Sequence, residues 1–149
     1  MKKYKGLSNL SISVIVNLLK REKIFVDKIV LHVRSDLEIN KITLEKLKGD
    51  LEKFDLNVTI SKEYKYGEKL FMKDSFITIF EFSYCEESLK TITNYSENIF
   101  SWNQPKFPEN FTLLSGGKIV FYCIAHEHYF RFINIEDGIL KRISKNLSS

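Results

Sequence analysis

Alternating apolar and polar positions predict several short strands. Residues 28–34 place isoleucine, leucine and valine on one side, which is typical of a half-buried strand. The more polar side of this segment carries His32, so we expect His32 to be an ordinary surface histidine. The same period of two predicts further strands over 56–61 and 75–84.

Apolar residues at helical spacing predict helices before and between these strands. Residues 43–54 carry an apolar stripe, and we expect Thr43 to cap this helix while Ile42 and Leu47 form a hydrophobic staple. Residues 8–23 are ambiguous: the apolar spacing favours a helix, whereas the β-branched residues within the segment would also suit a strand. We favour the helix.

The C-terminal third of the chain has the pattern of a hairpin followed by another strand. Apolar runs at 111–114 and 119–125 flank Gly116 and Gly117, which tolerate the positive φ of a tight hairpin turn. A further strand is predicted over 129–135. One helix is expected before this segment, opened by a pair of glutamates, and a short helix is expected at the C-terminus.

This order of elements predicts the fold class. Residues 62–73 are polar and aromatic and contain Gly67, which indicates a hairpin turn or a mobile loop. Strands that follow one another directly favour antiparallel pairing. We therefore predict a single α+β domain over residues 1–149, with a mainly antiparallel sheet of five to six strands and helices packed on one side.

Composition and charge restrict the class of protein. The 149 residues are 44% hydrophobic and 13% aromatic, which excludes a disordered chain. The net charge of +4 is spread among acids rather than gathered in a dense basic stripe, so we favour a solvated surface. A nucleic-acid binder that uses the basic N-terminal region is the least favoured hypothesis. No apolar run approaches the roughly 20 residues that cross a bilayer, so we expect no membrane partner.

The two cysteines and the N-terminus point to a cellular compartment. No secretory signal pattern is present in the first residues. Cys85 and Cys123 lie far apart, without the spacing of a redox or zinc motif. We therefore expect a cytoplasmic protein with two reduced thiols.

His126, Glu127 and His128 form the one constellation that could carry metal or acid–base chemistry. In an extended strand the two imidazoles would point the same way and could share a metal ion. A third ligand is missing nearby, and we favour a polar turn between two strands, with one imidazole hydrogen-bonded to a carbonyl. A small metal-dependent enzyme or sensor using the two histidines is the alternative.

The remaining motifs give no catalytic residue. A nucleophilic pair of Cys123 and His126 is disfavoured, because residues three apart on a strand face opposite ways. The spacing of a phosphate-binding loop and that of a serine hydrolase are both missing. We therefore predict no catalytic residues, no metal ligands and no cofactor.

The segment from Trp102 to Phe132 resembles small proteins of low-GC bacteria, some of them immunity-like. Those proteins share a W-x-x-P-x-x-P-E-[DN] lead, a hairpin and an A-H-E tripeptide, which corresponds here to residues 125–127. The resemblance covers about 30 residues and implies a non-enzymatic binding role. We therefore expect an immunity-type or inhibitor protein that neutralises a protein partner by occlusion.

Aromatic residues are dense in the same third of the chain. If they are exposed they would form a contact surface, and if they are buried they are core. The residues predicted to bind a partner are Trp102, Tyr122, His126, Glu127, His128, Tyr129 and Arg131.

Overall fold

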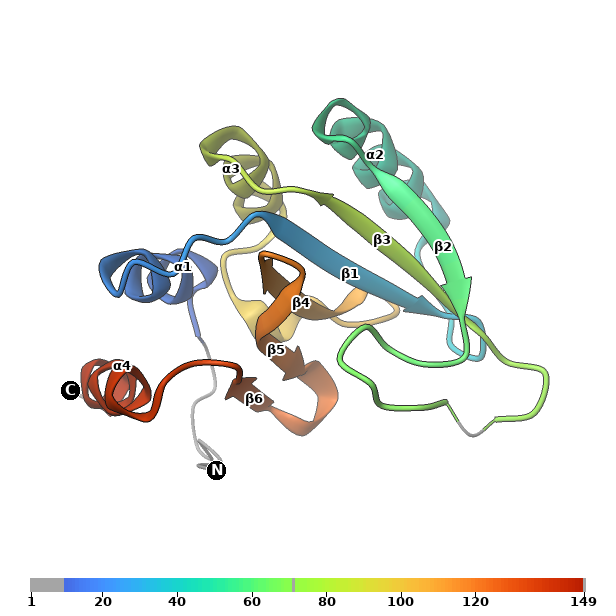
Figure 1. Cartoon of the computed structure of the whole chain (residues 1–149). Coiled ribbons are helices and arrows are strands. Elements are labelled where there is room, and N and C mark those ends of the chain that lie inside the picture. The colour runs from blue at the N-terminus through green and yellow to red at the C-terminus, as the bar shows by residue number, and fades with distance from the viewer. Residues whose placement is uncertain (1–9, 71, 149) are drawn as a thin grey trace.

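A computed structural model describes residues 10–70 and 72–148, which form four α-helices and one six-stranded sheet (Figure 1). The helices are α1 (Ile12–Arg21), α2 (Lys41–Leu51), α3 (Glu86–Tyr95) and α4 (Asp137–Ser148). The strands are β1 (Lys28–Arg34), β2 (Asn57–Ser61), β3 (Ile77–Ser83), β4 (Glu109–Ser115), β5 (Lys118–Ile124) and β6 (Tyr129–Phe132).

The sheet has the order β2-β3-β1-β4-β5-β6, and every neighbouring pair is antiparallel. The predicted α+β class with an antiparallel sheet is therefore confirmed. All six predicted strands are present. The strand after the histidines ends at Phe132, three residues before its predicted end.

The helices pack on one face of the sheet and bury the main core there. Alternate residues of β1 face them, while each helix contributes its own apolar stripe, led by Ile15, Leu47, Ile92 and Ile143. Trp102 is fully buried in this core, and its indole Nε1–H donates to the carbonyl of Ser96 at 3.1 Å.

The ambiguous N-terminal segment is a helix. Helix α1 begins after Ser11, whose hydroxyl accepts the amide of Val14 at 3.2 Å, and it ends with Lys20 and Arg21 in its last turn. A serine cap and a basic C-terminal turn both stabilise a helix through its orphan amides and its dipole. Within the described residues the segment holds no strand.

Helix α2 is capped by Asn40 rather than by Thr43. The Asn40 side-chain oxygen accepts the Thr43 amide at 3.0 Å. Ile42, predicted to be half of a hydrophobic staple, is 85% exposed. Both predictions were wrong for one reason: the helix starts two residues earlier than the apolar stripe indicates, because Asn40 is the better cap.

We expect Asn40→Ala to lower the free energy of unfolding by about 1 kcal/mol, since it removes the one side-chain cap of α2. Thr43→Ala is the matched control and should change the unfolding free energy by less than about 0.5 kcal/mol. Urea denaturation of both variants checks this. Equal losses in the two variants would contradict the assignment of the cap.

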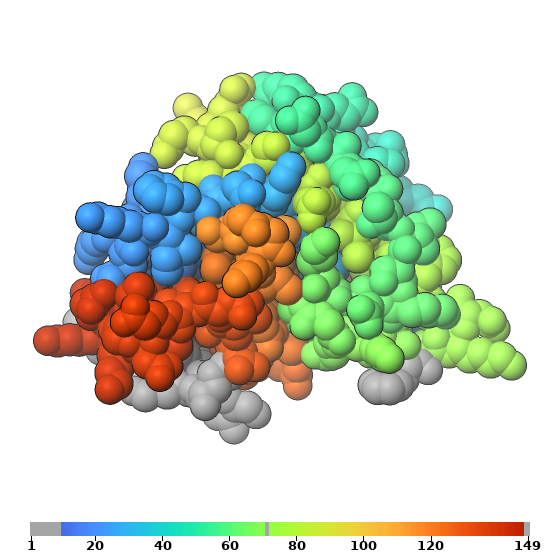
Figure 2. Space-filling view, in the orientation of Figure 1, coloured from blue at the N-terminus to red at the C-terminus, as the bar shows by residue number. Residues whose placement is uncertain are grey.

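The opposite face of the sheet is covered in part by a small hairpin, residues 62–70. The hairpin is closed by an isolated bridge between Glu63 and Lys69 and turns at Gly67, which has φ 96°. Figure 2 shows this segment, in green, packed against the orange β4–β5 hairpin. Beneath it lies a second apolar cluster of Val30, Tyr64, Ile77, Ile79 and Leu114.

A β-bulge in β4 changes which side chains reach that covered face. Val30 of β1 opposes Thr112, whereas His32 opposes Glu109, so β4 has one extra residue between these pairs. Asn110 adopts φ 56° within the bulge. Because of the extra residue, Glu109 and Thr112 share one face although they lie three positions apart.

Candidate functional site

A cluster of polar and aromatic side chains lies between the 62–70 hairpin and the sheet. Its members are His32 of β1, Tyr64 and Tyr66 of the hairpin, Glu109 and Asn110 of β4, and Tyr122 of β5. We call these six residues the covered cluster. His32, Glu109 and Asn110 are buried, and the tyrosines lead from them towards the rim of the hairpin.

His32 is fully buried, so its prediction as a surface histidine was wrong. Its Nε2 lies 3.1 Å from the backbone amide of Lys65, which can only donate. Nε2 is therefore the acceptor, and Nδ1 carries the proton and donates to the carbonyl of Asn110 at 3.0 Å. Burial lowers the pKa of His32 to about 4, so the neutral form persists.

Glu109 is buried beside His32 and is held by a single hydroxyl. The Tyr64 O–H donates to Glu109 Oε1 at 2.6 Å. Among the described residues, Glu109 Oε2 has no hydrogen-bond partner although it is buried. Burial raises the pKa of Glu109, while the Tyr64 hydrogen bond and the positive charges of His126 and Arg34 oppose this shift.

Asn110 connects three separate parts of the chain. Its amide nitrogen donates to the Tyr66 hydroxyl at 2.9 Å, and its side-chain oxygen accepts the Ala125 amide at 3.0 Å. Its backbone carbonyl accepts from His32. The positive φ of the bulge is tolerated by asparagine better than by most residues, which explains the residue type at this position.

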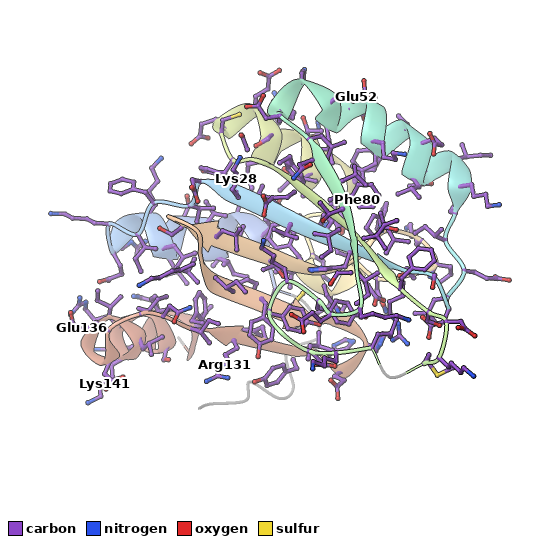
Figure 3. The ribbon with its side chains drawn as sticks, turned by 45° about the vertical axis from the view of Figure 1, so that its right-hand side comes forward. Lys28, Glu52, Phe80, Arg131, Glu136 and Lys141 are labelled. Carbon is purple, nitrogen blue, oxygen red and sulfur yellow. The ribbon has the colours of Figure 1, made fainter. Side chains whose placement is uncertain are left out.

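The tyrosines form a continuous series from the covered cluster to the exposed part of the sheet. The rings of Tyr64 and Tyr66 stack at 5.1 Å, and those of Tyr66 and Tyr122 at 4.4 Å. The Tyr122 and Tyr129 rings follow at 6.3 Å. Arg131 pairs with Tyr122 across β5 and β6, and its exposed side chain projects from the sheet in Figure 3.

The His126–His128 segment forms a corner between β5 and β6. Residues Ala125–Glu127 make one 3₁₀ turn, and His128 has φ 48°. His126 Nδ1 lies 3.2 Å from the side-chain oxygen of Asn103, whereas the His128 ring stacks on Phe100 at 4.9 Å. The interpretation as a polar turn is confirmed, and the two imidazoles have different neighbours.

The remaining candidate chemistry gains no support from the geometry. Within residues 10–70 and 72–148 there is no group of three or more histidine, cysteine, aspartate or glutamate side chains that could hold a metal ion. Cys123 is buried, and burial raises the pKa of its thiol well above the usual range, which keeps it protonated.

The structure gathers most of the predicted contact residues at one place. Tyr122, Tyr129 and Arg131 share the face beside the hairpin. Glu127 belongs to the adjoining corner: it repels Glu68 of the hairpin and adds to the burial that raises the pKa of Glu68. Trp102, by contrast, is fully buried in the core and cannot contact a partner, so its prediction as a contact residue was wrong.

Sequence reasoning missed His32, Tyr64, Tyr66, Glu109 and Asn110. One local signal was available for the first of them: Val30 lies on the same side of β1 as His32 and is apolar, which indicates a partly buried face. The other four depend on the bulge and on the docking of the hairpin.

Comparison of the chain with protein-family models, with curated proteins and with solved structures gives no match. In the part of the chain that the structure describes, no helix has both the length and the apolar character needed to span a membrane.

Proposed function

We propose that this protein binds a protein partner through the face formed by the 62–70 hairpin, β5 and β6, and that it neutralises the partner by covering it. The observation that carries the proposal is the stacked pair Tyr66–Tyr122, supported from behind by buried Tyr64, continued by Tyr129 and ending beside Arg131. This is the activity of an inhibitor or an immunity-type protein that works in the cytoplasm.

The chemistry of this face suits protein recognition. Tyrosine and arginine dominate the binding energy of protein interfaces, because they combine large contact area with polar ends. Stacking holds Tyr66 and Tyr122 in place before a partner arrives, which lowers the entropy lost on binding. The hairpin backbone is also held to the sheet by the hydrogen bond from the Lys65 amide to His32.

Charge on this face adds specificity. Arg131 lies exposed on β6, while Glu127 and Glu68 lie at the corner and on the hairpin. A partner surface that presents an acid opposite Arg131 and a base opposite the two glutamates would be complementary. Such complementarity selects partners and speeds association more than it adds affinity.

We expect Arg131→Glu to weaken binding of the partner at least about tenfold, the effect of losing an interface arginine and adding repulsion. The partner is identified by co-expression with the products of neighbouring genes and by affinity capture. Its dissociation constant is then measured by titration calorimetry, and relief of its activity by an inhibition assay.

Arg21→Glu makes the same change of charge at an exposed position on α1 and serves as the matched control. Binding should be retained in this variant. The proposal fails if both variants bind equally well, or if no captured protein is inhibited.

A further inference from the structure

The outer edge of β2 offers a second surface, which the proposed partner face does not use. Strand β2 is the first in the sheet order and, among the described strands, pairs with β3 only. Its first four residues are exposed, with Val58 at 44% and Ile60 at 69%. Alternate residues of such a strand direct their backbone amides and carbonyls away from the sheet.

In the described part of the chain, this edge lacks the features that usually prevent strands from pairing between molecules. Edge strands are normally protected by charged residues, proline, bulges or a covering segment. Residues 57–61 (N-V-T-I-S) contain neither a charge nor a proline, and the pairing of β2 with β3 is regular. Strand β6, at the other end of the sheet, is shorter and carries Arg131.

The sequence of β2 is complementary to itself. In an antiparallel pair centred on Thr59, Val58 would lie opposite Ile60 of the other copy, and Asn57 opposite Ser61. The two apolar residues share the side of Phe80, so four apolar side chains would meet there. The polar residues would meet on the other side, and residues 57–61 themselves carry no charge that would repel the same strand of the second copy.

We infer that β2 pairs with β2 of a second copy of this chain, antiparallel about a two-fold axis at Thr59, so that the two sheets join. The contact involves one short strand from each copy and lies at the small end of the range of protein interfaces. It therefore gives a dimer that forms reversibly with rising protein concentration. This inference is independent of the partner-binding face.

Cross-linking tests the register directly. Thr59→Cys, made together with Cys85→Ser to remove the exposed native thiol, places two cysteines opposite each other. The Cα atoms of paired residues lie about 4.5–5.5 Å apart in antiparallel strands, within the range for a disulfide. Mild oxidation should give a covalent dimer. Asn57→Cys in the same background is the matched control, because its copies would be offset by about 13 Å along the strands.

Sedimentation of the native chain over a range of concentrations gives the dissociation constant. Ile60→Lys should raise it at least tenfold, whereas Phe25→Lys, at a position 74% exposed, should leave it unchanged. Circular dichroism confirms that both variants fold. A native chain that stays monomeric, a dimer that tolerates Ile60→Lys, equal cross-linking at both cysteine positions, or pairing of β2 only with a different protein overturns the inference.

Discussion

The free energy of unfolding should fall by about 3 kcal/mol between pH 6.5 and pH 4 because of one residue, His32. In the folded protein its pKa is about 4, while the unfolded chain has the ordinary value of 6.5. Between these two pH values, His32 is protonated in most unfolded molecules but stays neutral in most folded ones. Stability is therefore full above pH 6.5 and is lost as the pH falls towards 4.

The first cause is burial, which disfavours the charged imidazole and lowers the pKa of His32. The geometry acts in the same direction, because His32 Nε2 accepts a hydrogen bond from the amide of Lys65. A protonated imidazole has no acceptor nitrogen. Protonation would therefore place the Nε2–H of His32 against the amide N–H of Lys65, break this hydrogen bond and release the hairpin. Arg34 and Lys65 are nearby positive charges, whereas Asp36 and Glu109 are nearby acids. Burial raises the pKa of Glu109, so its contribution to stability changes in the opposite direction. As the pH falls, Glu109 takes up a proton and its burial costs less free energy.

The measurement is urea unfolding of the native chain and of His32→Asn at several pH values. The variant should be less stable at pH 7 but should lose less stability between pH 6.5 and pH 4. His128→Asn is the matched control, because it replaces an exposed histidine at a positive φ that asparagine also adopts and leaves His32 in place. The loss of stability attributed to His32 should remain in this variant. Titration of His32 by nuclear magnetic resonance gives the pKa directly, and a value near 6.5 would contradict the prediction.

Removal of the Tyr64 hydroxyl should lower the free energy of unfolding by nearly as much as the protonation of His32. Tyr64→Phe leaves both oxygens of buried Glu109 without a donor in the described structure, and we expect a loss of about 2–4 kcal/mol in unfolding free energy at pH 7. Tyr66→Phe removes a hydroxyl that accepts from the neutral amide of Asn110. Its loss should be about 1 kcal/mol.

A double-mutant cycle separates the hydrogen bond from other effects of the tyrosine. Tyr64→Phe should cost much less in a Glu109→Gln background, since the partner that it leaves behind is then uncharged. Denaturation of the four proteins gives the coupling energy. If the two substitutions are additive within about 0.5 kcal/mol, Tyr64 does not stabilise the carboxyl group.

The strands and helices were predictable because their signals are local. The alternation over residues 28–34 and the glycine pair at Gly116 and Gly117 each specify their element without reference to the rest of the chain. The exposure of a strand is less local. Val58 and Ile60 have the pattern of buried residues, yet they are exposed because β2 lies at the edge of the sheet.

The candidate site was predictable only in its C-terminal half. Tyr122, Tyr129 and Arg131 lie two to nine positions apart on paired strands, so their proximity follows from the hairpin pattern. His32 and Glu109 come from strands far apart in sequence, and a single bulge residue decides whether they meet. The alternation of apolar and polar residues does not reveal where a bulge lies. A bulge adds one residue to the strand, so every side chain beyond it lies on the opposite face from the one that the alternation predicts.

The two ends of the Asn110 side chain make the hairpin and the histidine corner dependent on each other. The amide nitrogen is engaged by Tyr66 and the oxygen by Ala125, so the group cannot rotate to favour one side without losing the other. A change that breaks the hydrogen bond on the hairpin side would therefore leave the corner held by an amide that is free to turn, and the reverse holds for the corner. If ligands bound at both places, any coupling through Asn110 would change the two affinities by the same factor.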